Sequence, residues 1–184
     1  MDAQEILKLY STGHRDFSHV SLVQVCLTNA KLIGVQLVGA ELIGADLRGV
    51  DLTEAHLNQA KLNQANLADA DMIQVCLTHA DLSGADLSGA NLTHADLGGA
   101  DLSGANLGGA DLRNADLNKA DLSGADLRGA DLTGANLRDA NLRDANLEGA
   151  YLGKADLTGA NVQGANIDRA GLHETRMADG TVYA

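Results

Sequence analysis

The sequence has no proline and no tryptophan, and only four of its 184 residues are phenylalanine or tyrosine. The lack of proline excludes a collagen-like chain, and the shortage of aromatic residues argues against a conventional globule anchored by aromatic side chains. Basic residues are also few, since 13 lysines and arginines face 25 aspartates and glutamates, for a formal net charge of −12. Because phosphate backbones are negatively charged, this balance argues against direct nucleic-acid binding.

Long apolar runs are absent as well. No stretch approaches the roughly 20 apolar residues that a membrane span requires, so we expect no membrane contact. The N-terminus has neither the basic start nor the apolar stretch of a signal peptide. The chain has two cysteines, Cys26 and Cys76, which without an export signal favour a reducing compartment. The prediction is a cytoplasmic protein whose two thiols are free.

What the sequence has in abundance is a five-residue repeat. From residue 15 to residue 179 it divides into 33 consecutive units without an insertion or a deletion. The third position is leucine in 28 units and apolar in all the others, and the first position is alanine in 26. The second position is aspartate or asparagine in 22 units and the fifth is glycine in 15, as in Ala-Asp-Leu-Ser-Gly at residues 80–84.

A period of five fits neither a regular helix nor a flat strand. The order apolar, polar, apolar describes three residues of strand that point in, out and in. The fourth and fifth positions must then turn the chain, and glycine at the second corner site suits a type II turn with positive φ. For corners without glycine, such as residues 53–54 and 118–119, we expect another turn type.

Repeated right-angled bends would close one coil every four units. The 33 units then give about eight coils, and parallel pairing at about 4.8 Å makes a rod about 40 Å long. Leucine and alanine fill its interior, which leaves no room for a ligand or cofactor.

This pattern resembles the A-(D/N)-L-X-X signature of pentapeptide repeat proteins over about nine-tenths of the chain. The resemblance implies an all-β fold, a right-handed quadrilateral parallel β-helix. The leucine- and alanine-rich form without loops is similar to cyanobacterial members of the family. Some pentapeptide repeat proteins bind DNA gyrase and related topoisomerases and confer quinolone resistance, and in some the C-terminal ends pair to form dimers.

The two ends of the chain depart from the repeat. Residues 1–14 are predicted to form an N-terminal capping helix, because an apolar stripe follows Asp2 and Glu5, which are suited to a helix start. Residues 15–179 form the predicted β-helix, and residues 180–184 form a C-terminal tail. The repeat decays toward this tail, where we expect an end-to-end homodimer through Leu172, Met177, Val182 and Tyr183.

One outward row of second-position residues includes His56, Cys76 and Asp96, twenty residues apart. These residue types occur in thiol proteases and in metal sites. On a flat convex wall, however, they would have neither a cleft nor oxyanion donors. We therefore predict no enzymatic activity, no metal site and no cofactor.

Residues 62–112 contain seven aspartates and no lysine or arginine, and we call this segment the acidic belt. One interpretation is that its carboxylates bond the local backbone and keep the rod soluble. The other is that they imitate the charge of duplex DNA. The prediction is therefore a non-enzymatic rod that binds an unknown protein, with a DNA mimic of a topoisomerase or another duplex-binding protein as the alternative. The candidate acidic surface comprises Asp81, Asp86, Asp96, Asp101, Asp111 and Asp121.

Overall fold

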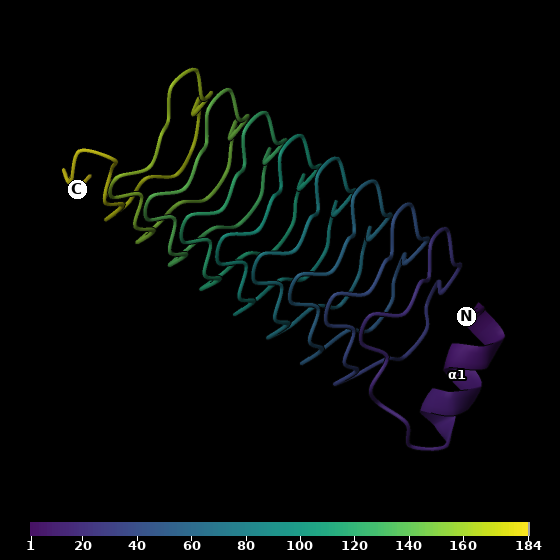
Figure 1. Cartoon of the computed structure of the whole chain (residues 1–184). Coiled ribbons are helices and arrows are strands. Elements are labelled where there is room, and N and C mark those ends of the chain that lie inside the picture. Colours follow the sequence, from purple (N-terminus) through teal and green to yellow (C-terminus); the bar gives the residue numbers. More distant parts are fainter. Residues whose placement is uncertain (184) are drawn as a thin grey trace.

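The structure, a computed structural model, describes residues 1–183. The chain forms a rod of stacked coils with its two termini at opposite ends (Figure 1). Parallel bridges join each second-position residue to the one twenty positions later, from Asp16 with Gln36 to Asp156 with Arg176. Twenty residues are four units, so each coil has four walls and four corners, as the resemblance to pentapeptide repeat proteins implies.

The backbone amides of each unit are satisfied in a fixed way. The amides at the second, third and fifth positions donate to carbonyls of neighbouring coils, and the next first-position amide closes the turn onto the leucine carbonyl. In units with aspartate or asparagine at the second position, such as residues 80–84, the fourth-position amide donates to the Oδ1 atom of that side chain. In residues 81–85 the five acceptors are Ala60, Asp101, Asp81, Ser103 and Leu82, at 2.7–3.0 Å. The β-helix therefore leaves no amide of such a unit without a partner, as buried backbone requires.

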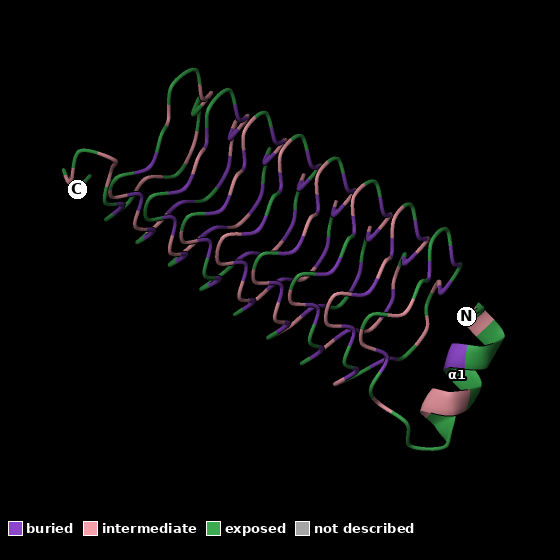
Figure 2. Cartoon of the chain, viewed as in Figure 1, coloured by how far each residue is buried: buried purple, intermediate pink, exposed green. Residues whose placement is uncertain are grey.

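The core consists of the first- and third-position side chains. Leucines from Leu22 to Leu157 and alanines from Ala40 to Ala160 are buried along the rod, and Figure 2 shows these buried positions recurring in every coil. Phe17 and Met72 take the place of leucine in the core. The interior is thus a continuous stack of side chains, which accounts for the fold.

All regular corners have the same conformation at the fifth position. Gly84 has a φ of 62°, and Glu54 and Lys119 both have 58°. Corners without glycine also keep the turn bond, as from Ala55 N–H to the Leu52 carbonyl. The expectation of another turn type for these corners is therefore wrong. A positive φ costs a non-glycine residue about 1–2 kcal/mol. The hydrogen bonds to the adjacent coil outweigh this cost, because another backbone conformation at the corner would break them.

Helix α1 (Ala3–Ser11) is the N-terminal helix that the sequence predicts. Asp2 is its N-cap and accepts a bond from the Glu5 amide at 2.8 Å. Ile6 is fully buried against the first coil, and the Tyr10 hydroxyl donates to the Ile33 carbonyl at 2.9 Å. The helix therefore covers the apolar end of the rod, as a solenoid cap must.

The C-terminal end is closed by a short reversal of the chain. The Met177 amide donates to the Thr181 carbonyl at 2.7 Å, and the Tyr183 amide donates to the Thr175 carbonyl at 3.0 Å. Arg176 and Val182 form an antiparallel bridge. The last residues thus pair with the edge of the final coil but do not cover its core, so the two ends of the rod differ.

Candidate interaction surfaces

The second-position side chains form four walls, each named here after its first residue. Residues of one wall follow each other every twenty positions and lie on adjacent coils. The Asp16 wall faces away from the Cys26 wall, and the Ser21 wall faces away from the Lys31 wall. Any outer residue therefore belongs to a wall or to a corner between two walls.

The candidate aspartates have a structural role that sequence reasoning left open. In 21 of the 22 units with aspartate or asparagine at the second position, Oδ1 accepts the amide two residues later. All six candidate aspartates do so. Asparagine supplies the same oxygen without the charge, so the fold requires the acceptor and does not require the negative charge.

The six candidates are distributed over all four walls. Asp81, Asp101 and Asp121 are consecutive on the Ser21 wall. The other three are separate: Asp86 lies on the Cys26 wall, Asp96 on the Asp16 wall and Asp111 on the Lys31 wall. The structure therefore brings three of the six together.

Arginines neutralise part of the acidic surface. Arg113 binds Asp111, with Nη2 at 2.5 Å from Oδ2, and this bond holds the pKa of the Asp111 carboxyl below its usual value. Asp46 with Arg48 and Asp126 with Arg128 form the same pair. An arginine two residues after an aspartate is the sequence signal for such a pair, and the prediction of the acidic surface did not include it.

In contrast, Asp81, Asp101 and Asp121 form no ion pair within the described residues. They form the longest row of consecutive carboxylates on any wall. The neighbouring second-position residue on one side is Lys61, which pairs with Glu41 at 3.1 Å. On the other side is Asn141, whose amide donates to Asp121 at 3.0 Å.

His56, Cys76 and Asp96 are stacked neighbours on the Asp16 wall, as the spacing predicts. Burial, together with the nearby Asp96 carboxylate, raises the pKa of the Cys76 thiol. A nucleophilic cysteine requires the opposite shift, so this trio is not poised for thiol catalysis. Cys26 and Cys76 are free thiols, and residues 1–183 contain no cluster of three or more side chains suited to a metal ion.

Within the described part of the chain, no helix has the length and apolar character needed to cross a membrane.

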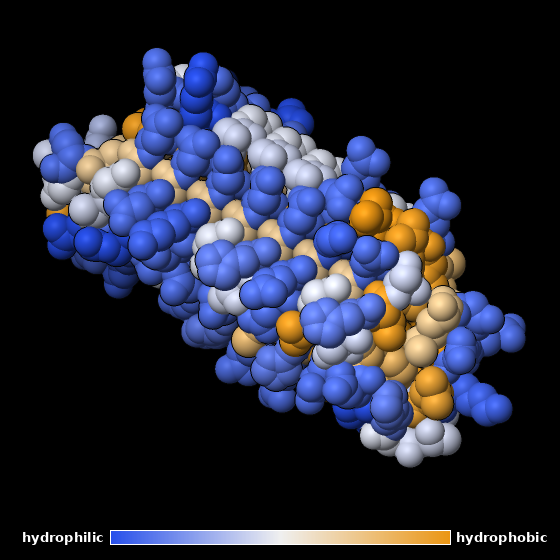
Figure 3. Space-filling view, in the orientation of Figure 1, coloured by the Kyte–Doolittle hydropathy of each residue, from blue (hydrophilic) through white to orange (hydrophobic). Residues whose placement is uncertain are grey.

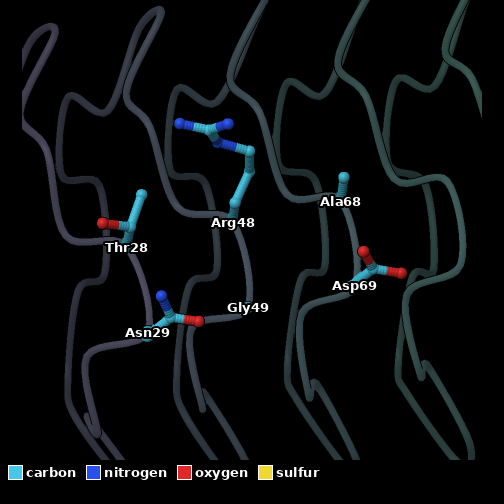
Figure 4. A pocket seen from close by; sticks show the side chains of 6 residues that line it. All are labelled: Thr28, Asn29, Arg48, Gly49, Ala68 and Asp69. Atoms are coloured by element: carbon cyan, nitrogen blue, oxygen red, sulfur yellow. The ribbon is translucent and has the colours of Figure 1, made fainter.

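The hollows on the outside are shallow grooves at corners. One of about 310 Å³ is lined by Thr28, Asn29, Arg48, Gly49, Ala68 and Asp69. Figure 4 shows Gly49, which has no side chain, between Asn29 and Asp69 of the two adjacent coils, with Ala68 next to Asp69. The Arg48 guanidinium is held by Asp46 at 2.7 Å. Such a groove can take up a protruding side chain of a binding protein, but it does not enclose a small molecule.

The C-terminal candidates lie around the open core of the last coils. Leu172 and Met177 line an apolar cavity of about 70 Å³ that reaches inward to Leu147. Met177 and Tyr183 also line an outer groove of about 340 Å³, and Val182 is exposed. The end of the rod therefore presents an apolar surface.

A four-walled parallel β-helix with leucine and alanine inside defines a class of solenoid whose working surface is its exterior. The sequence model of the Pentapeptide repeats family matches this chain in 8 copies, over residues 16–49, 51–89, 77–109, 95–134 and 135–173. The chain therefore belongs to the pentapeptide repeat family, and the predicted right-handed quadrilateral β-helix is confirmed.

The relatives include cyanobacterial proteins. HetL of Nostoc sp. strain PCC 7120, described as involved in the regulation of heterocyst differentiation, is 36% identical, with a TM-score of 0.63 and 100% of each chain covered. An uncharacterised Synechocystis protein is 70% identical over 30 residues, which are 16% of this chain and 18% of that protein. QnrB1, a plasmid-mediated fluoroquinolone resistance protein, is 17% identical over 84% of this chain and 87% of its own, with a TM-score of 0.54, and shares the fold.

Proposed function

We propose that the protein is a non-enzymatic rigid rod that binds another protein through its outer walls or ends. The observation that supports this most is the apolar interior: the leucines and alanines of the coils are buried, so the charged groups of the described residues lie on the exterior. The free thiols of Cys26 and Cys76 fit a cytoplasmic site of action, since a reducing compartment keeps thiols unpaired.

This proposal is tested by isolating a partner and rebuilding the complex. The full chain, immobilised, would capture proteins from a cyanobacterial extract, and each captured protein would then be purified and titrated against the chain. The expected result is one saturable complex of fixed stoichiometry. If no captured protein forms a saturable complex after purification, the proposed role as an interaction module is wrong.

The acidic belt supports a second function, a DNA mimic that binds gyrase or another duplex-binding protein. Its seven aspartates occupy about two and a half coils, or about 12 Å of the rod axis. Because Arg113 pairs with Asp111, six of these carboxylates are free within the described chain, about one negative charge per 2 Å, which is close to the charge per about 1.7 Å of duplex DNA. The net charge of −12, spread over a rod of about 40 Å, is about half as dense, so mimicry would be confined to the belt.

A gyrase supercoiling assay tests the mimic. The wild-type chain should inhibit at micromolar concentration, and the variant with all six candidate aspartates changed to asparagine should not. Because asparagine retains the Oδ1 acceptor used by the fold, the variant should remain folded by circular dichroism. Equal behaviour of the two proteins in the assay would exclude mimicry through these residues.

The exposed C-terminal end supports end-to-end homodimers through Leu172, Met177, Val182 and Tyr183. The expected result is a mass that rises with concentration in sedimentation velocity. Val182→Asp should abolish the rise, because Val182 is 54% exposed. The matched control is Leu7→Asp, which places a charge at an exposed apolar site of the opposite end. A monomer mass at every concentration would contradict this pairing.

A further inference from the structure

Of the large exposed apolar side chains in residues 20–160, Val23 and Ile33 lie in the first coil and Tyr151 lies near the C-terminal end. Val23 is 47% exposed and Ile33 is 44% exposed, and Figure 3 shows hydrophobic surface concentrated toward the N-terminal end of an otherwise mostly hydrophilic rod. Val23 and Ile43 are neighbours at one corner of adjacent coils, because the Gln24 amide donates to the Ile43 carbonyl at 2.9 Å. This corner, called here the apolar corner, borders the Ser21 wall at Glu41.

The same corner becomes polar farther along the rod, with Asn63 next, serine in the three coils that follow and Arg143 after them. Ser83, Ser103 and Ser123 occupy the positions of Val23 and Ile43 in later coils. Beside them on the Ser21 wall lie the unpaired carboxylates of Asp81, Asp101 and Asp121, listed in rod order. One strip of surface therefore offers apolar contacts at one end and a row of negative charge at the other, with the ion pair of Glu41 and Lys61 between them.

The spacing of this strip suits a particular partner geometry. Successive coils place the second and third carboxylates about 4.8 Å and 9.6 Å from the first. On one face of an α-helix, residues i, i+4 and i+7 lie at about 0, 6 and 10.5 Å along the axis. Alternate residues of an extended strand lie at about 0, 6.6 and 13.2 Å, so the mismatch at the third site is about 1 Å for a helix and about 4 Å for a strand.

The apolar corner extends the same match. Ile43 lies two coils before Asp81, or about 9.6 Å, which corresponds to seven helical residues at about 10.5 Å. Val23 lies one coil, or about 4.8 Å, before Ile43. Four residues of a helix span about 6 Å, which is close to this distance. All these helix positions fall on one face. From first to last they span about 27 Å, against about 24 Å for the five coils from Val23 to Asp121, so a single helix can reach all five residues to within about 3 Å.

We propose that the Ser21 wall and its apolar corner form the docking site for an amphipathic α-helix of a partner protein, with apolar residues at one end and lysines or arginines on the same face at the other. The inference rests on the proposed function as an interaction module and specifies its surface. Burial of the apolar corner supplies affinity, and the carboxylate row selects a basic helix and fixes its direction.

The test uses a labelled synthetic helical peptide and the full chain. The peptide has leucine at its first and fifth positions and lysine at its twelfth, sixteenth and nineteenth, and binding is followed by fluorescence anisotropy. The wall variant combines Asp81→Asn, Asp101→Asn and Asp121→Asn. The matched control removes the same charge from other walls with Asp51→Asn, Asp71→Asn and Asp96→Asn. A corner variant combines Val23→Ser and Ile43→Ser, which introduce the residue that later coils carry at this corner.

The expected result is micromolar binding that weakens at least about tenfold in the wall variant and about fivefold in the corner variant, and less than about threefold in the control. Equal weakening in the wall and control variants would overturn the docking site, since it would reveal only general attraction between opposite charges. Equal binding of a peptide with the reversed order of residues, or no binding by 100 µM, would also overturn it. If a captured protein forms a saturable complex equally well with the wild-type chain and the wall variant, this docking site is wrong but the proposed function stands.

Discussion

At the N-terminal end of the rod, helix α1 covers the first coil, whereas at the C-terminal end the last coil stays open. Ile6 is fully buried, but Ile167, at a core position of the last complete coil, is 37% exposed. Leu172 and Met177 are also only partly buried. Each coil buries its leucines only when another layer covers it. The repeat can therefore extend the core but cannot cover the core of the last coil. The residues outside the repeat therefore determine which end of the rod keeps an exposed core that another molecule can contact.

The largest effect should separate the middle of the rod from its open end. Leu102→Ala should lower the free energy of unfolding by about 2–5 kcal/mol, because it leaves a cavity in a fully buried stack. Leu172→Ala should cost about 1 kcal/mol, because this side chain already meets solvent. Urea unfolding followed by circular dichroism measures both. Equal losses would mean that the C-terminal end is covered in solution.

The covered end can be tested in the same way. Ile6→Ala should cost about 2–4 kcal/mol, because it removes the buried contact of α1 with the first coil. Leu7→Ala on the same helix should change stability by less than about 0.5 kcal/mol, because Leu7 is exposed. Thermal unfolding gives both values. If Ile6→Ala has no effect, α1 does not stabilise the rod.

A smaller effect concerns the bond between the second-position side chain and the amide two residues later. Asp101→Ala should cost about 1 kcal/mol, because the Ser103 amide loses its acceptor. Asp101→Asn keeps the acceptor and should cost nothing, since it also relieves repulsion with Asp81 and Asp121. Asn166→Ala should cost a similar amount, because the Asp168 amide loses the same kind of acceptor. Chemical unfolding of the three variants would contradict this role if Asp101→Asn were as unstable as Asp101→Ala.

The smallest effect should appear on acidification. The bond from Arg113 holds the pKa of Asp111 below its ordinary value of 3.8, and that from Arg128 does the same for Asp126. These pairs stabilise the fold fully above the ordinary value, and the contribution is lost as the pH falls through the lower folded-state pKa. Both side chains are partly solvent-exposed, so each should contribute less than about 1 kcal/mol. NMR titration of Arg113→Ala should show the Asp111 pKa rising, and an unchanged pKa would exclude this cause.

Much of the architecture was predictable because the repeat is both long and strict. A leucine every five residues and an alanine two residues before it leave one arrangement in which all can point inward. The capping helix was also predictable, since Asp2 and the apolar stripe that includes Ile6 are local signals. The corners at Glu54 and Lys119 were not, because local preference there opposes the bonds to the adjacent coil, and those bonds prevail.

The candidate surface was less predictable than the fold. The acidic belt was visible in the sequence, but a belt in sequence winds around all four walls. The pairing of Asp111 with Arg113 reduces the free charge at one candidate. The row of Asp81, Asp101 and Asp121 emerges only when residues twenty apart are placed side by side, and its proximity to Val23 and Ile43 depends on the same coil geometry.

The period, the inward residues, the excess of negative charge and the cap at the N-terminal end follow from the amino-acid sequence alone. These features are local, because each follows from the side chains of one unit or one short segment. The fold was needed to show which carboxylates of different coils are neighbours and which end of the core is open. Those properties depend on how coils stack on one another, and stacking joins residues that are distant along the chain.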